Sequence, residues 1–387
     1  MDMMISRRVV LILLAIEAVG CGGTDSEDRS VPPLIPLDTI LTIRSDRLWS
    51  VQAVRFAKER YVVANGGSRE VFVFDHAGNL EKRFGRQGQG PGEFGYIADV
   101  AVTGDSVYVL DSLLRRITLF VDGTITREWS LRSVAGAATR LAVAADGQIT
   151  VAMVRTSQEY GSPPGPNYHR DVIQFVTLMA SGSDTQWHDR IAIDGTERMT
   201  RFVGQATYHM LPPYRADVSV DLTTHGIVAT EHRSGWTRFL TWNGDSTTLW
   251  PAVSVTTWVS DAELRTLEAD VERRVRRLRE IGGEAELFQT SARAAIERWN
   301  GEIPRPVFES LKSDGQMIAV QRYDPGDSHS TEWLVLDRSG QAYGRWILPS
   351  NARLLTIDGL QLAVVARDSL DAETVHILSI DRAVEAR

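Results

Sequence analysis

The sequence predicts an all-β protein, a β-propeller of six blades with four antiparallel strands in each blade. Short segments rich in Val, Ile, Leu and Phe fill the chain after residue 38, and Gly, Asp and Asn separate them as turns. A unit of strand, polar break and second strand recurs along the chain, and four-stranded units at a spacing of about 40–50 residues are typical of propellers. The 387 residues are 43% hydrophobic and 24% charged, which are ordinary globular proportions.

The first 20 residues predict an export signal. Arg7 and Arg8 precede the apolar run Val9–Ile16, which is shorter than the roughly 20 residues that span a bilayer but suits the core of a signal peptide. After Glu17, the segment Ala18–Gly20 leads to Cys21, the single cysteine of the chain. This arrangement resembles a bacterial lipoprotein signal, which implies that Cys21 is lipidated and becomes the first mature residue. The alternative is an ordinary secretory signal with an incidental cysteine.

The segment that follows the signal predicts a tether. Residues 21–37 are small, polar and proline-containing, a composition typical of a flexible linker. No apolar run after residue 20 is long enough for a membrane span. We therefore expect an exported protein whose folded body, residues 38–387, contacts the bacterial cell envelope only through a lipid anchor, at the outer membrane or the periplasmic face.

The repeating unit also predicts how the ring closes. Six strand pairs share the same form: Tyr61–Phe74, Val107–Phe120, Ile149–Leu178, Ile227–Trp242, Met317–Leu336 and Leu362–Ile380. With a strand before and after each pair, the unit has four strands, a to d. The last unit ends after three strands, whereas the body begins with an unassigned strand, Thr39–Arg44. We expect this strand to be strand d of the sixth blade, which removes the open edge of the sheet.

Two segments resemble known families. The loop Phe84–Phe94, the strand Val107–Asp111 that leads into Ser112, and the following Arg116 are similar to the NHL repeat, which has a glycine-rich loop, a strand ending in Asp-Ser and an arginine. The stretch Trp333–Pro349 is similar to bacterial six-bladed propeller lipoproteins. These groups include binding scaffolds and some enzymes, so the resemblance implies a fold and no single activity.

Residues 260–299 break the strand pattern and predict a helical hairpin inserted between blades 4 and 5. Apolar residues recur there at helical spacing, Ser260 with Glu263 forms a capping box, and Gly282 follows the first helix. Five arginines lie between residues 273 and 279, which suggests binding to nucleic acid or to anionic lipid. The segment also holds nine Asp and Glu against eight Arg, and the whole chain has a net charge of -8. A solvated, ion-paired face is therefore favoured, and no nucleic-acid partner is expected.

The glycine-rich loop Gly85–Gly92 could cradle a phosphate. That function needs a helix N-terminus behind the loop and usually a lysine followed by Ser or Thr. Here Glu93 and a strand follow the loop. A crossing between blades is therefore favoured over a phosphate site.

Three polar residues end the strands b of their blades, at one rim: Asn65, Asp111 and Glu231. Carboxylate and amide oxygens are the ligands that Ca²⁺ prefers, so this rim could serve a metal-assisted hydrolase or lyase. The alternative is that these side chains cap turns and hold Arg115 or Arg116. We favour turn capping and expect no cofactor. Ca²⁺ would be bound only under the alternative hypothesis of a hydrolase or lyase.

The long connections all join strand b to c or strand d to the next strand a, and these two classes lie on the same side of a propeller. The long connections are Arg155–Asp171, Asp194–Arg215, Pro251–Arg305 and Arg322–Glu332. Loops on a rigid scaffold commonly carry function. The predicted contact residues are Tyr168, His169, His209, Tyr214, Arg215 and Trp236. We expect a binding or scaffold protein with a protein, peptide or glycan partner in the envelope, and favour binding over catalysis.

Replacement of Cys21 tests the anchor. Without its thiol the chain cannot be lipidated, so Cys21→Ser should yield a soluble or unprocessed precursor, measured by membrane fractionation and by the mass of the mature chain. A mature variant that still sediments with membranes would contradict the lipoprotein prediction.

Overall fold

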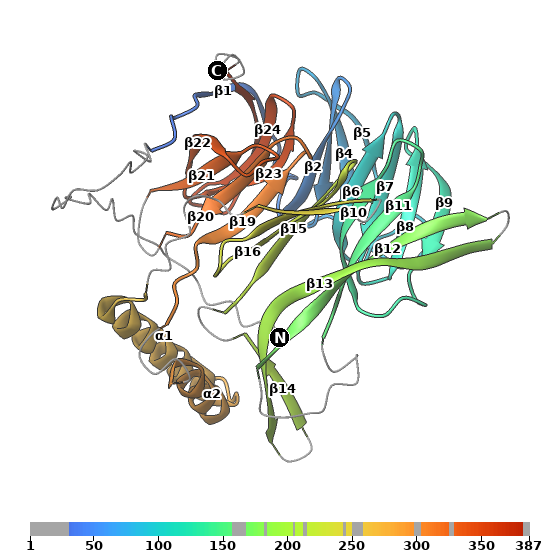
Figure 1. Ribbon diagram of the computed structural model, residues 1–387. Coiled ribbons are helices and arrows are strands. Elements are labelled where there is room, and N and C mark those ends of the chain that lie inside the picture. The colour runs from blue at the N-terminus through green and yellow to red at the C-terminus, as the bar shows by residue number, and fades with distance from the viewer. Residues whose placement is uncertain are drawn as a thin grey trace.

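The computed structural model describes residues 31–156, 168–181, 184–203, 206–211, 215–242, 245–249, 258–297, 303–324 and 329–381. Six antiparallel sheets surround one axis (Figure 1), as the sequence predicts. Their strands, from the inside outward, are as follows. Blade 1 has β2 (Val51–Ala57), β3 (Arg60–Asn65), β4 (Glu70–Asp75) and β5 (Leu80–Phe84); blade 2 has β6 (Ile97–Thr103), β7 (Ser106–Asp111), β8 (Arg116–Val121) and β9 (Thr124–Ser130); blade 3 has β10 (Ala137–Val143), β11 (Ile149–Arg155), β12 (Tyr168–Ser181), β13 (Asp184–Val203) and β14 (Ala206–Met210); blade 4 has β15 (Val218–Thr223), β16 (Gly226–Glu231), β17 (Thr237–Thr241) and β18 (Ser246–Leu249); blade 5 has β19 (Phe308–Ser313), β20 (Ile318–Arg322), β21 (Ser330–Leu336) and β22 (Ala342–Pro349); blade 6 has β23 (Ala352–Asp358), β24 (Gln361–Arg367), β25 (Glu373–Ile380) and β1 (Leu37–Arg44).

The hydrophobic core lies between the blades. Each of six buried clusters joins two neighbouring blades, so every sheet is covered on both faces. Strand β3 illustrates the cause, because side chains alternate across a strand: Val62 packs toward blade 2 and Val63 toward blade 6. The inner strands β2, β6, β10, β15, β19 and β23 contact one another in succession around the axis.

Strand β1 closes the ring as predicted. It pairs antiparallel with β25, from Leu37 opposite Ile380 to Arg44 opposite Thr374. Ile43, which is 1% exposed, packs into the core between blades 6 and 1. The N-terminal end of the described chain thereby covers an edge that the C-terminal strand would otherwise expose to solvent.

The end of the segment predicted as a tether also packs on the propeller. The amide of Ile35 donates to the carbonyl of Arg345 over 2.9 Å, and Arg345 donates back to Pro33 over 2.9 Å. Ile35 is 2% exposed and lies against Gly344, where a Cβ atom would stand 2.2 Å from the Ile35 side chain. Residues 33–35 therefore belong to the folded body.

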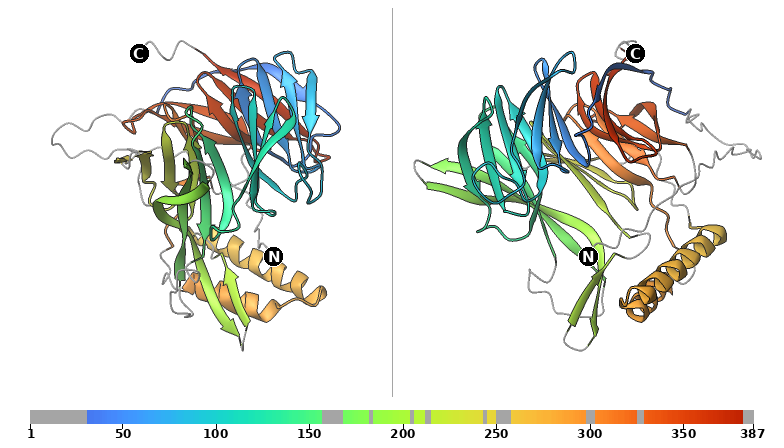
Figure 2. Two further views of the ribbon diagram at one scale, coloured as in Figure 1. Left: turned by 90° about the vertical axis from the view of Figure 1, so that its right-hand side faces the viewer. Right: turned by 180° about the vertical axis from the view of Figure 1, so that it is seen from behind.

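Blade 3 departs from the predicted pattern. Its outer hairpin, β12 and β13, has strands of 14 and 20 residues, and β14 adds a fifth strand. Two strands thus occupy most of the predicted loop Asp194–Arg215, because β13 continues to Val203 and β14 follows. Tyr168 pairs with Met199, and Met199 pairs with Met210 of β14. Figure 2 shows this extension leaving the disc beside the two helices. Beyond Asp194 the side chains of β13 still alternate between its two faces, and Gly195, Glu197 and Met199 are buried.

The helical hairpin lies between β18 and β19, as predicted, and consists of α1 (Asp261–Glu280) and α2 (Ala285–Glu297). Ser260 and Glu263 form the expected capping box, and Gly282 with a φ of 69° follows α1. Val271 and Val275 of α1 pack with Phe288 of α2 and with Met199 of β13, so the hairpin rests on the extension of blade 3. Neither helix in the described part of the chain is apolar enough over its length to cross a membrane.

Truncations from the N-terminus test these assignments. Deleting residues 22–30 should leave the free energy of unfolding unchanged, and deletion through Pro36 should lower it by about 1.5–3 kcal/mol, because Ile35 leaves the core. Deletion through Arg44 should abolish the cooperative transition, because β25 loses its outer neighbour β1 and the core between blades 6 and 1 loses Ile43. Chemical denaturation measures all three, and equal stability of the last two truncations would contradict the closure.

Candidate functional site

The two sides of the disc differ in their connections. Turns between strands a and b, and between c and d, are short: for example, residues 58–59, 104–105 and 122–123. The b-to-c and d-to-a connections lie on the opposite side, which we term the loop face, and they include the helical hairpin and residues 85–96. The predicted asymmetry between a plain face and an elaborated face is therefore present.

The predicted contact residues divide into three groups. Tyr214 and the side chains of Tyr168 and His209 lie outside the described residues. His169 is a half-buried residue of β12, opposite Arg198. The third group, Arg215 and Trp236, has partners within the described residues.

Arg215 and Trp236 have specific partners within the described residues. Arg215 forms an ion pair of 2.8 Å with Asp217. Trp236 is half-buried against the core between blades 3 and 4, with the Arg238 guanidinium 5.0 Å from its ring centroid. Neither residue needs an external partner to account for its position.

An ionic network fastens blade 3 to blade 4 behind these residues. Arg233 of blade 4 pairs with Glu197 of blade 3. Within blade 3, Arg198 donates to the fully buried Asp171 over 2.5 Å. Burial raises the pKa of Asp171 despite the nearby Arg198 guanidinium. Burial would likewise raise the pKa of Asp217, but Arg215, His232 and a hydrogen bond from Thr196 outweigh it and lower that pKa. The network supports the extension of blade 3.

Asn65, Asp111 and Glu231, the three residues considered as metal ligands, cap turns. Asp111 is fully buried and accepts hydrogen bonds from the amides of Gly95, Tyr96, Leu113 and Leu114. Asn65 accepts from the amide of Trp49 and donates to the carbonyl of Arg47, and Glu231 accepts from the amide of Ser234. Among the described residues, no three His, Cys, Asp or Glu side chains are grouped to hold a metal ion.

Arg115 and Arg116 do not bind Asp111 through their side chains. Their guanidinium groups donate to loop carbonyls, Arg115 to Gly136 and Arg116 to Gly90 and Glu93. The interpretation of Asp111 as a turn cap is therefore supported, whereas the accompanying arginine contact is wrong.

The glycine-rich loop 85–92 is a crossing between blades, and its own carboxylate fills it. Glu93 accepts from the amides of Gln89 and Gly90 over 2.9 and 2.8 Å and pairs with Arg86 over 2.6 Å. These bonds, with the amide of Gly90 foremost, lower the pKa of Glu93. An external phosphate would have to displace this carboxylate.

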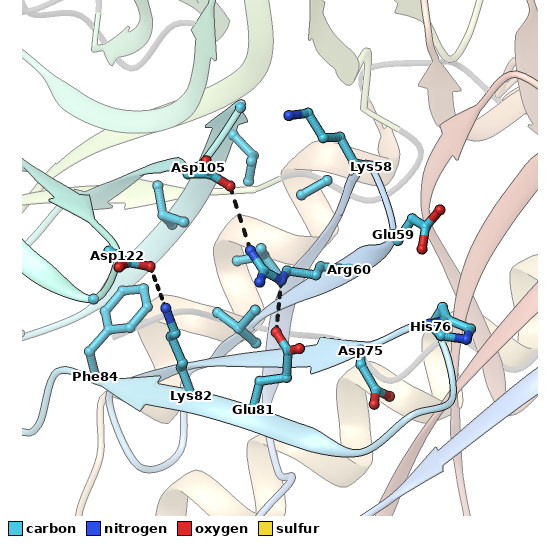
Figure 3. A pocket seen from close by; sticks show the side chains of 17 residues that line it. Lys58, Glu59, Arg60, Asp75, His76, Glu81, Lys82, Phe84, Asp105 and Asp122 are labelled. Carbon is cyan, nitrogen blue, oxygen red and sulfur yellow. Dashed lines mark hydrogen bonds and ion pairs between the residues drawn. The ribbon is translucent and has the colours of Figure 1, made fainter.

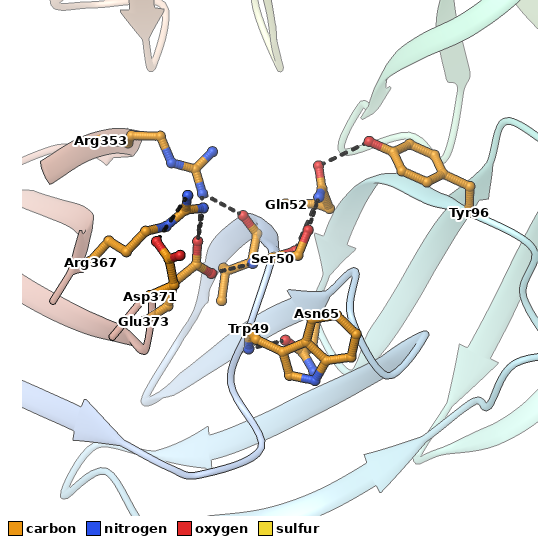
Figure 4. Close-up of polar contacts among 10 residues, drawn as sticks. Trp49, Ser50, Gln52, Asn65, Tyr96, Arg353, Arg367, Asp371 and Glu373 are labelled. Carbon is orange, nitrogen blue, oxygen red and sulfur yellow. Dashed lines mark hydrogen bonds and ion pairs between the residues drawn. The ribbon is translucent and has the colours of Figure 1, made fainter. Parts of the chain in front are cut away.

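A cluster that no sequence pattern indicated lies on the loop face of blades 1 and 2. We term Trp49, Gln52 and Tyr96 the aromatic shelf (Figure 4). Trp49 is 55% exposed and Tyr96 is 40% exposed. The Tyr96 hydroxyl donates to the Gln52 amide oxygen over 3.3 Å, and Gln52 donates to the Ser50 carbonyl over 3.0 Å.

The aromatic shelf is held rigidly from below. Trp49 lies against Gly67, where a Cβ atom would stand 2.1 Å from its indole ring. The Arg69 guanidinium lies 5.7 Å from the Tyr96 ring centroid and donates to the Gly95 carbonyl. Asn65 and Asp111, by capping their turns, fix the backbone amides of Trp49 and Tyr96. Two large aromatic groups are thus exposed in fixed positions.

A cavity of about 300 Å³ opens on the plain face between blades 1 and 2 (Figure 3). Its charged walls are largely neutralised by one another. Arg60 pairs with Glu81 over 2.7 Å and with Asp105 over 3.5 Å, and Lys82 pairs with Asp122. Lys82 lowers the pKa of Asp122. Because these pairs already satisfy the polar groups, the cavity is a weaker candidate than the aromatic shelf.

Comparisons with known proteins agree on the fold. A family model described as a 6-bladed beta-propeller, DUF5128, matches residues 34–124. No curated protein matches the sequence. The structure is similar to that of a candidate exported protein from Bacteroides fragilis NCTC 9343, at 10% identity and a TM-score of 0.52, covering 91% of this chain and 98% of that one.

Two further solved structures are similar at lower scores. A member of the DUF4221 family from Bacteroides vulgatus has 9% identity and a TM-score of 0.48, with 91% of this chain and 99% of that one covered. A gluconolactonase from Xanthomonas campestris has 11% identity and a TM-score of 0.45, with coverages of 91% and 95%. Neither of these two similarities carries an argument about this chain.

Replacement of Asp111 tests turn capping. Asp111→Ala should lower the free energy of unfolding by about 3 kcal/mol, because four amides lose their acceptor inside the protein. Asp111→Asn should cost about 1 kcal/mol, because its amide oxygen retains most of these bonds. Urea denaturation gives both values, and similar losses for the two variants would contradict the capping role.

Proposed function

We propose that this protein is an extracytoplasmic binding or scaffold propeller, anchored by a lipid at Cys21, that recognises a protein, peptide or glycan partner of the cell envelope through its loop face. The carrying observation is the aromatic shelf: two aromatic side chains exposed on fixed backbone. Tyrosine and tryptophan supply much of the energy in recognition surfaces, because they bury a large area at a low cost in side-chain entropy.

Two exposed arginines beside the aromatic shelf support the loop face as the binding surface. Arg353 and Arg367 converge on the buried carboxylate of Glu373, and their side chains remain 51% and 49% exposed (Figure 4). The Glu373 carboxylate also accepts from the amide of Val51 over 2.5 Å. Guanidinium groups held in this way can donate further hydrogen bonds to a partner without an added ordering cost.

The anchor and the repeat family belong to the same proposal. The signal before Cys21 supports export and lipidation, and the similarity of blade 2 to the NHL repeat supports membership of a group that includes binding scaffolds. A metal-assisted reaction is not proposed, because the carboxylates and amide that motivated it are engaged with backbone amides.

Site-specific photo-cross-linking in intact cells tests the proposed face. A photoreactive phenylalanine analogue in place of Trp49 or Tyr96 should give one shared cross-linked product. The control position is Leu80, 48% exposed at the plain side of blade 1. We expect at least a tenfold higher yield from the two loop-face positions, measured by blotting and mass spectrometry. Equal yields from all three positions, or none from the loop face, would refute the proposal.

A further inference from the structure

Charged side chains of the inner strands converge on the axis of the ring. Arg55 of β2, Asp221 of β15, Lys312 of β19 and Thr356 of β23 hold equivalent levels in their blades, opposite Val62, Val228, Ala319 and Ala363 of strands b. Asp99 of β6 and Arg140 of β10 lie opposite Leu110 and Ala152, further along their strands b. We term Arg55, Asp99, Arg140, Asp221 and Lys312 the axial cluster.

Contacts across the blades show that these side chains meet. Arg55 donates to Asp99 of blade 2 over 2.6 Å and to the Thr356 hydroxyl of blade 6 over 3.1 Å. Asp99 accepts from the amide of Leu141 in blade 3, and Asp221 of blade 4 accepts from the amide of Ser313 in blade 5. All blades thus contribute to one polar belt around the axis.

Two cations of this belt lack a counterion in direct contact. Lys312 forms no ion pair or side-chain hydrogen bond with any described residue. Arg140 has one hydrogen bond within the described chain, to the carbonyl of its neighbour Thr139. Both side chains are half-buried, so solvent reaches them. Three cations face two carboxylates here, in a chain whose net charge is -8.

The titration of Lys312 reflects this imbalance. Burial lowers its pKa to about 8, Asp221 and Asp99 oppose the decrease, and Arg140 and Arg55 add to it. A lysine enclosed near like charges is costly to keep protonated, and an anion beside it removes that cost. These charges come from blades 1 to 4, so groups from most of the ring affect the pKa of Lys312.

We propose that the axial cluster is a binding site for a small oxyanion, held between Lys312 and Arg140. The ligand group is a carboxylate or a tetrahedral phosphate- or sulfate-type group, since each accepts hydrogen bonds from an ammonium and a guanidinium together. Asp221 sets the net charge of the site and opposes the anion. The site is separate from the aromatic shelf and does not depend on the function proposed for the loop face.

Thermal unfolding of the full chain tests this site with sodium sulfate and sodium acetate as separate probes, at constant ionic strength and pH 7. At least one probe should raise Tm by about 2 °C or more. Lys312→Met should raise Tm in the absence of the probe and abolish its effect. The control, Lys58→Met at the exposed turn of blade 1, should retain both parent values. A response to sulfate alone identifies the tetrahedral class and a response to acetate alone the carboxylate class.

The effect of pH and a second variant complete the test. The probe-dependent increase in Tm should shrink as the pH rises from 7 to 9.5, because Lys312 loses its proton while both probes keep their charge. Asp221→Asn, which keeps an acceptor for Ser313, should enlarge the increase. If Lys312→Met does not fold, this variant decides. No response of the parent beyond that of Lys312→Met, or no enlargement in Asp221→Asn, would overturn the proposal.

Discussion

Closure of the ring by β1 against β25 is the constraint on which the other features of this protein depend. A propeller has no core inside a single blade; its apolar side chains are buried between blades, so each sheet needs a neighbour on both faces. Blade 6 combines strands from both ends of the described chain, and Ile43 of β1 lies in the core between this blade and blade 1. Glu373 adds a polar link by accepting from the amide of Val51 across the same joint.

Closure also brings functional groups together from distant parts of the sequence. Arg55 and Thr356 are 301 residues apart in the chain and lie within 3.1 Å. The aromatic shelf depends on the same joint, because Trp49 and Ser50 belong to the connection that leads from β1 into blade 1. The loop face and the axial cluster are therefore products of one closed scaffold, although they carry different chemistry.

The sequence predicted features that depend on residues close together in the chain. It missed features that depend on residues brought together only by the closed ring. Strand alternation and Gly turns predicted the blades, the unpaired strand Thr39–Arg44 predicted the closure, and Ser260 with Glu263 predicted the start of α1. The extension of blade 3 was missed because polar strands resemble loops when their partner is unknown. Lys312, Arg140 and Asp221 each look like an ordinary surface charge, and no local spacing relates them. Trp49 was overlooked because its connection is short.

Native-state hydrogen exchange at β1 measures the role of closure most directly. If the closed ring unfolds as one cooperative unit, the hydrogen-bonded amides of β1 and β25 should exchange only by global unfolding. Their free energy of exchange and its denaturant dependence should equal those of the amides of the inner strand β6. Exchange of the β1 amides through a separate opening of much lower free energy, with β6 still fully protected, would contradict the account.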